Sequence, residues 1–98
     1  MGGGNYHESP DKLSAKTRNL HRAITSLIEE LEAIDWYQQR VDVTEDEELR
    51  DILAHNRDEE KEHAAMILEW LRRNDEEMAE ELETFLFQKE KITEIEES

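Results

Sequence analysis

Three polar residues occupy positions where two amphipathic helical patterns call for apolar side chains. Glu30 interrupts the first pattern, and Glu60 and His63 interrupt the second. A spacing of three residues on a helix lets a carboxylate and an imidazole reach one point beside it. Removing a carboxylate from water is costly unless a cation compensates its charge. The pattern therefore predicts a metal site, and the alternative is a Glu–His hydrogen bond that fixes how the helices align.

These residues make half of a known type of ligand set. Di-metal sites in four-helix bundles take two Glu-x-x-His motifs, plus one Glu from each of the other two helices. The chain offers one such motif, Glu60-x-x-His63, and the single Glu30. A two-fold dimer would complete the set and place the metals on its axis. Carboxylates and imidazole suit Fe(II), so we expect a di-iron centre; a zinc, manganese or peroxidase-like centre stays open.

Two long helices must position these ligands. Ser9-Pro10 indicates a helix start, and no Gly or Pro interrupts the predicted helix over residues 10–40. Thr44 and Glu47 match a capping box, which predicts a second helix over residues 45–73. A connection of a few residues makes the pair an antiparallel hairpin. The predicted class is therefore all-α.

A shorter third helix should follow a cap at Asn74-Asp75, and the helical pattern fades after Phe87 into an acidic tail. From Glu90 on, we expect this tail to be disordered or loosely helical. We divide the chain into a flexible tail (1–8), a helical hairpin domain (9–90) and an acidic tail (91–98). Two helices and a short third cannot enclose a core, so we expect oligomerisation into a ferritin-like four-helix bundle.

The apolar residues of the long helices form rows with alternating spacings of three and four, as in coiled-coil seams. The row on residues 45–73 comprises Leu49, Leu53, Asn56, Glu60, His63, Ile67 and Trp70. Residues 10–41 carry one row of Leu13, Leu20, Ile24, Leu27, Ile28 and Leu31, and a second of Ala23, Leu27, Glu30, Ile34, Tyr37 and Val41. Two rows on one helix predict two partners, namely the second helix and a second chain.

The composition excludes several classes of function. The 98 residues carry a net charge of −15, which repels nucleic acids and anionic membranes. The chain has no Cys, which rules out disulfides, thiolate zinc sites and thiol nucleophiles. No apolar run approaches the roughly 18 residues of a membrane span. We expect a soluble acidic protein in the cytoplasm.

Four further residues have two interpretations each. Tyr37 follows Glu30 by seven residues on the same helix face, so it is either an electron donor or hydrogen-bond partner at the site, or a packing aromatic. Glu29, Glu32 and Trp36 face away from the predicted core. They are either a solvated face with one exposed Trp, or a surface that attracts Fe(II) at another interface.

Two blocks, EELEAIDWYQQR (29–40) and AHNRDEEKEHAAMILEWLRRND (54–75), resemble the encapsulated ferritins, the ferritin-like cargo of encapsulin nanocompartments. The resemblance runs from about Leu20 to Phe87. It implies a half-ferritin hairpin, dimers assembled into a ring-shaped decamer, and a ferroxidase that oxidises Fe(II) with dioxygen at di-iron centres between chains. It also implies iron mineralisation inside an encapsulin shell, as a cytoplasmic compartment.

The resemblance also assigns residues. The di-iron ligands of the family match Glu30, Glu60 and His63, and its aromatic residues beside the centre match Tyr37 and Trp36. Its second, weaker metal site on the path of iron matches Glu29 and Glu32, where calcium or another divalent cation is expected. The family carries a C-terminal apolar peptide that docks in the shell. The last residues here, Ile95-Glu96-Glu97-Ser98, do not resemble it, so shell association is expected from the resemblance alone.

Overall fold

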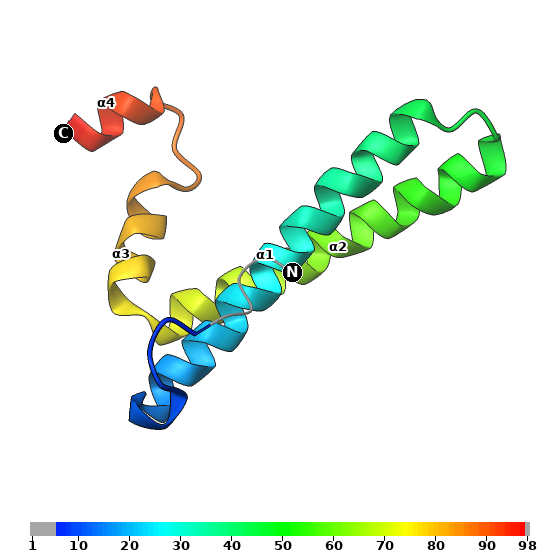
Figure 1. Ribbon diagram of the computed structural model, residues 1–98. Coiled ribbons are helices and arrows are strands. Elements are labelled where there is room, and N and C mark those ends of the chain that lie inside the picture. Colours follow the sequence, from blue (N-terminus) through cyan, green and yellow to red (C-terminus); the bar gives the residue numbers. More distant parts are fainter. Residues whose placement is uncertain (1–5, 98) are drawn as a thin grey trace.

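The structure is a computed structural model, and it describes residues 6–97. Two long helices, α1 (Ala15–Val43) and α2 (Glu47–Asn74), lie side by side as an antiparallel hairpin (Figure 1). A single 3-10 turn, η1 (Pro10–Lys12), precedes α1; α3 (Glu76–Phe85) and α4 (Ile92–Glu97) follow α2. Residues 6–97 contain no strand. The predicted all-α hairpin with a shorter third helix is confirmed.

The first long helix begins later than the sequence suggested. Ser9 caps only the 3-10 turn and makes no side-chain capping bond. Leu13 is extended, and Ser14 then accepts a hydrogen bond from the backbone N–H of Thr17 at 3.0 Å, so α1 begins at Ala15. The start predicted at Pro10 is wrong, because Ser14 supplies a second hydroxyl cap that satisfies the first turn of the long helix.

The capping box predicted for the second helix is also wrong. The carboxylate of Asp46 accepts a hydrogen bond from the backbone N–H of Leu49 at 2.8 Å, so α2 begins at Glu47. Thr44 instead ends α1, where its hydroxyl donates to the carbonyl of Arg40. An anionic cap gains from the positive end of the helix dipole, which favours Asp46 over a threonine. The cap predicted at Asp75 is confirmed, because Asp75 accepts from the N–H of Met78 at 3.1 Å.

The packed line between α1 and α2 is thin. Among residues 6–96, only Ala23, Ala64 and Leu71 are buried, and two of these are alanines that let the helix backbones approach closely. On α1 the line follows the predicted row that contains Ala23 and Glu30. On α2 it passes through Ala64 and Leu71, so the predicted row is wrong at its ends: Leu49 and Trp70 are exposed.

The remaining helices lead away from the hairpin (Figure 1). α3 contacts α2, and α4 contacts α3. α4 lies in the segment predicted to be disordered or loosely helical. No helix within the described part of the chain is both long and apolar enough to cross a membrane. The hairpin is therefore the part of the fold that positions the candidate ligands.

The cap of α2 gives a first test. Asp46→Ala removes the side-chain acceptor for the N–H of Leu49, so we expect the free energy of unfolding to fall by about 1 kcal/mol. Urea denaturation followed by circular dichroism, at one fixed chain concentration, measures the change. Glu45→Ala is the matched control, because it removes a carboxylate from the adjacent position. An equal loss in Glu45→Ala would show that charge near the helix end matters and the cap does not.

Candidate metal centre

The structure brings the three predicted ligands into one neighbourhood of the hairpin. Glu60 and His63 lie one turn apart on α2, with Oε2 of Glu60 3.7 Å from Nδ1 of His63. Their side chains are 27% and 43% exposed, respectively. Glu30 comes from α1 and is half-buried, and the charges of both α2 residues act on it. The prediction that Glu30 stands near the Glu60–His63 pair agrees with this geometry.

Glu30 is the electrostatically unfavourable member of the group. Its Oε2 is buried and finds no hydrogen-bond partner in the part of the chain that the structure describes. Burial raises the pKa of the Glu30 carboxyl, and the negative charge of Glu60 raises it further, while His63 acts in the opposite direction. A desolvated carboxylate oxygen without a donor, next to a second carboxylate, is stabilised by a bound cation. The buried orphan oxygen therefore fits a metal ligand better than a packing residue.

One chain does not close the site. In the part of the chain that the structure describes, no group of three or more His, Asp or Glu side chains is arranged to hold a metal ion. The two oxygen ligands and one imidazole nevertheless match the ligand types that Fe(II) accepts. The residues fit an iron site that needs further ligands from outside the chain, as the half-set in the sequence indicates.

The side chains of the other predicted residues differ in how far they are exposed to solvent. Tyr37 is half-buried in the same row of α1 as Glu30, and the guanidinium of Arg40 lies 5.4 Å from the centre of its ring. Glu29 is exposed, Glu32 is half-buried, and Trp36 is 51% exposed. The expectation that Trp36 is exposed is confirmed. The structure does not gather Glu29 and Glu32 with a third ligand.

Sequence reasoning missed a polar contact between the two long helices. Nη1 of Arg57, on α2, donates a hydrogen bond to Oε1 of Gln38, on α1, at 2.9 Å. The Arg57 side chain is only 19% exposed. The available signal was its position three residues before Glu60, which places it on the packed side of α2.

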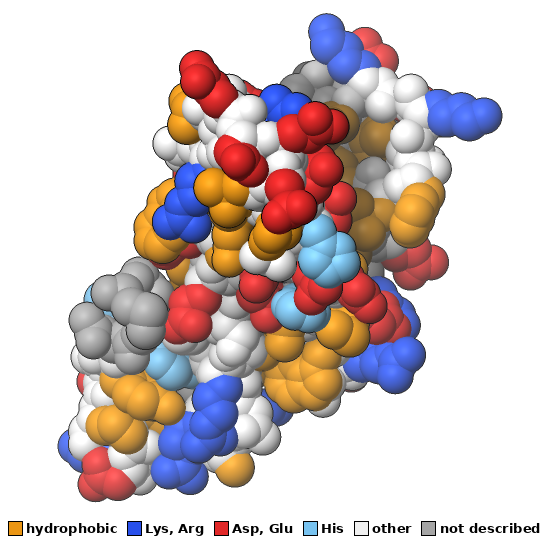
Figure 2. All heavy atoms as spheres, turned by 90° about the vertical axis from the view of Figure 1, so that its right-hand side faces the viewer, with side chains coloured by type: hydrophobic (Ala, Val, Ile, Leu, Met, Phe, Trp, Pro, Cys, Tyr) orange, Lys and Arg blue, Asp and Glu red, His pale blue; other side chains and the backbone are white. Residues whose placement is uncertain are grey.

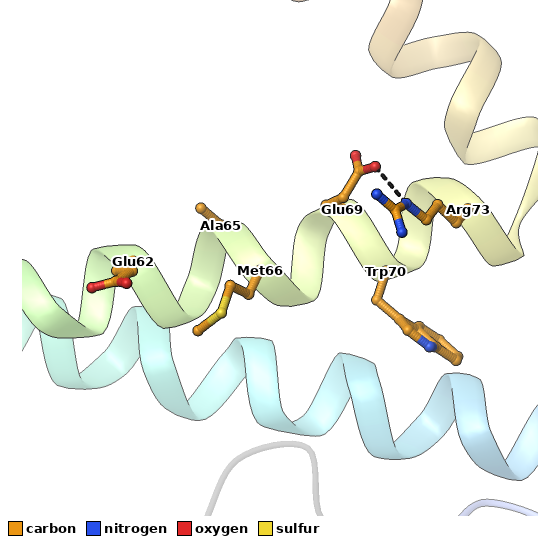
Figure 3. Close-up of a pocket in the computed structure, with 6 residues that line it drawn as sticks. All are labelled: Glu62, Ala65, Met66, Glu69, Trp70 and Arg73. Carbon is orange, nitrogen blue, oxygen red and sulfur yellow. Dashed lines mark hydrogen bonds and ion pairs between the residues drawn. The ribbon is translucent and has the colours of Figure 1, made fainter.

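Apolar side chains are exposed along α2 after the candidate ligands, among them Met66 and Trp70. Figure 2 shows one face of the molecule, where hydrophobic side chains lie among acidic ones. A shallow groove of about 490 Å³ lies along α2 and is lined by Glu62, Ala65, Met66, Glu69, Trp70 and Arg73. In Figure 3, Met66 and Trp70 project to the same side of the helix, whereas Glu69 turns away and pairs with Arg73 at 2.7 Å. Hydrogen bonds from Arg72 and Arg73 lower the pKa of Glu69 to about 2.

The comparisons with known proteins agree on one family. A family model described as EncFtn-like matches residues 5–89. An encapsulated ferritin-like protein of Rhodospirillum rubrum is 64% identical over 90 residues, covering 92% of this chain and 64% of that protein. An encapsulin nanocompartment cargo protein of Myxococcus xanthus is 46% identical over 61 residues, covering 61% of this chain and 47% of that protein. This chain thus spans less than two thirds of the length of either relative.

A solved structure supports the same assignment. The crystal structure of a protein from Nitrosomonas europaea superposes with a TM-score of 0.87 at 58% sequence identity. The match covers 90% of this chain and 97% of that chain. The hairpin and the shorter helix after it are therefore shared with an experimentally determined fold.

The raised pKa of Glu30 predicts a pH-dependent stability. The folded chain binds the proton of the Glu30 carboxyl more tightly than the unfolded chain does. This binding stabilises the folded chain below the ordinary pKa of 4.5, and the stabilisation is lost as the pH rises through the raised pKa. Glutamine stays neutral, so metal-free Glu30→Gln should be more stable than the unaltered protein at neutral pH and should lose this advantage below pH 4.5. Melting temperatures in the presence of a chelator measure the difference. Glu48→Gln, at an exposed position of α2, is the control, because the charge of Glu48 is not among those that act on Glu30. An advantage of Glu30→Gln that does not change with pH would contradict the prediction.

Proposed function

This chain belongs to the EncFtn-like family, and from this premise we propose that it is a ferroxidase that oxidises Fe(II) with dioxygen at di-iron centres shared by two chains. One observation carries the proposal: the buried Oε2 of Glu30 has no hydrogen-bond partner among residues 6–97 and lies near the Glu60–His63 pair. A buried, unpaired carboxylate is costly to retain without a cation. The family and the orphan oxygen independently support an iron site.

Each residue has a distinct role in the proposed centre. Glu30 and Glu60 bind Fe(II), the substrate, and offset its charge, while the imidazole of His63 binds the ion through a ring nitrogen. Two chains related by a two-fold axis bring four carboxylates and two imidazoles together, which is the ligand set of a di-iron bundle. Two Fe(II) ions held there give one electron each, which reduces dioxygen by two electrons. Tyr37, in the same row as Glu30, serves as a hydrogen-bond partner or a further electron donor.

We further propose that Glu29 and Glu32, beside the exposed Trp36, form a weaker cation site on the path of iron. The three residues share a helix, and the exposed carboxylate of Glu29 can attract cations from solvent. Calcium or another divalent cation would occupy this site when iron is absent. Its ligand set requires side chains from another chain, since the described residues of one chain do not complete it.

Assembly follows from the apolar surface that one hairpin leaves open. Ile24 and Leu31 are exposed on α1, and Ile52, Met66 and Trp70 are exposed on α2. The two groups belong to different helices of the hairpin. Apolar surface on both helices can meet more than one partner chain, which supports the proposed ring-shaped decamer built from dimers.

We propose that this ring works inside an encapsulin shell in the cytoplasm. The names of the Rhodospirillum rubrum and Myxococcus xanthus relatives support that location. A ring of hairpins has no evident cavity for a mineral, so the shell would hold the oxidised iron. Fe(II), dioxygen, further copies of this chain and the shell protein are the proposed partners.

Aerobic Fe(II) titration of the purified oligomer tests the ferroxidase. We expect a fast phase of Fe(III) formation that saturates near one iron per chain, about two per shared centre. Glu30→Ala and His63→Leu should lose this phase, whereas Glu48→Ala, at an exposed acidic position of α2, should keep it. If the unaltered protein oxidises Fe(II) no faster than buffer does, and His63→Leu keeps the oligomer, the ferroxidase is excluded. The protein would then be a non-catalytic helical scaffold, in which Glu30, Glu60 and His63 only fix helix register.

The proposed cation path gives a separate kinetic result. Glu29→Gln together with Glu32→Gln should raise the Fe(II) concentration needed for half-maximal rate and leave the rate at saturating iron unchanged, because capture is weakened and the centre is intact. Added salt should diminish the difference between this variant and the unaltered protein, since salt screens long-range attraction. Initial rates over a range of iron and salt concentrations measure both effects. A lower rate at saturating iron would place these carboxylates in the oxidation step instead.

A further inference from the structure

A polar bridge crosses between the two long helices in the half of the hairpin nearer their connection. Arg57 donates from Nη1 to Oε1 of Gln38 at 2.9 Å, and from Nε to the carboxylate of Asp58 at 3.0 Å. Gln38 in turn donates from Nε2 to Asp42 at 3.1 Å. The guanidinium and the amide are thus each held by two partners. We call the contact between Gln38 and Arg57 the bridge.

The apolar packing near the bridge does not by itself fix how the helices align. The buried residues of the hairpin are Ala23, Ala64 and Leu71, and none lies between Glu30 and the connection to α2. Apolar rows that repeat every seven residues can slide by one repeat and still meet apolar side chains. Such a slip would move Glu30 by about 10.5 Å along α2. A hydrogen bond between two particular residues is lost in any such slip.

We propose that Gln38 and Arg57 are positioning residues of the metal centre: their bridge sets the axial register of α1 on α2, and this register holds Glu30 against the Glu60–His63 pair. Arg57 lies one turn before Glu60, and Gln38 lies about two turns after Glu30 on the other helix. The inference rests on the proposed function, because it concerns the same centre.

In this proposal Arg57 acts on the centre by holding α1 and α2 in register, and its charge does not act on Glu30 directly. The charges that act on Glu30 are those of Glu60, His63 and Glu29, whereas the guanidinium of Arg57 is directed to Gln38 and Asp58. Arginine can donate in both directions from one planar group. Arg57→Lys keeps the positive charge but loses this geometry, so it should behave like Arg57→Ala. Gln38→Glu loses the donor to Asp42 but keeps the acceptor oxygen for Arg57, so it should keep the bridge and the register.

Cobalt binding tests the effect on the centre, since Co²⁺ reports ligand geometry in its visible spectrum. The full chain is titrated with Co²⁺ under nitrogen. Arg57→Ala and Gln38→Ala should each weaken Glu30-dependent binding by about tenfold and alter the visible bands. The double variant should be no weaker than either single variant, because both remove the same bond. Gln39→Ala is the matched control, because Gln39 makes its hydrogen bond to Asp35 within α1.

A distance measurement tests the register itself. The chain has no cysteine, so Lys16→Cys and Glu62→Cys place one spin label on each long helix at exposed positions. Labelled chain is diluted with unlabelled chain, so that the distance is read within one hairpin by pulsed electron paramagnetic resonance. The unaltered protein and Gln39→Ala should give one narrow distribution, and the two bridge variants should broaden or shift it.

The outcomes separate the two proposals. Unchanged distances, or unchanged Co²⁺ affinity and spectrum, in Arg57→Ala and Gln38→Ala would overturn the bridge and leave the ferroxidase standing. Retained affinity in Arg57→Lys with loss in Gln38→Glu would assign the effect to charge and would also overturn it. Absence of Glu30-dependent Co²⁺ binding in the unaltered protein would overturn the metal centre, and with it the positioning role.

Discussion

Two packed helices can bury a side chain only along the line where they touch, and this constraint governs the rest of the molecule. The line here holds Ala23, Ala64 and Leu71. Most larger apolar side chains of the hairpin remain partly or largely exposed, among them Leu31 and Met66. A single chain of this kind gains little from burial, so the proposed contact with a second copy would add to its stability. In the proposed dimer, the same contact would also complete the metal site.

The candidate ligands make the hairpin less stable on its own. Glu30 carries a desolvated carboxylate oxygen without a donor, beside the negative charge of Glu60. A leucine at the same position would extend the apolar row and avoid both penalties. Sites that violate the local rules of packing are commonly functional, because the free energy they lose in folding is recovered when a ligand binds. The proposed cation would account for the position of Glu30, for which packing among the described residues gives no reason.

Much of the fold was predictable, because long helices depend on signals that extend over many residues. The absence of Gly and Pro and the repeated apolar spacing were enough to predict both long helices and the hairpin. The ends depend on single side chains and were less predictable: Ser9 and Ser14 are equally good caps by type, and Thr44 and Asp46 are both residue types that cap helices. The packed row of α2 was misplaced because neighbouring rows of side chains are separated by only a fraction of a turn around the helix axis. Glu60 lies where the predicted row and the observed row meet. Arg57 was missed because a charged residue on a helix normally indicates solvent.

Polar residues fix where the helices of this hairpin begin and how they align, while apolar residues provide contact between the helices without fixing their alignment. Asp46 and Asp75 fix where α2 and α3 begin, and the hydrogen bond between Arg57 and Gln38 joins one particular turn of α1 to one particular turn of α2. Alanine and leucine rows are almost equivalent at every repeat, so they cannot supply this information. A site with one ligand on α1 and two on α2 tolerates little error in register, since each residue of slip moves a ligand by about 1.5 Å. A thin hairpin that holds such ligands therefore needs a directional bond between its helices, and it needs that bond close to the ligands.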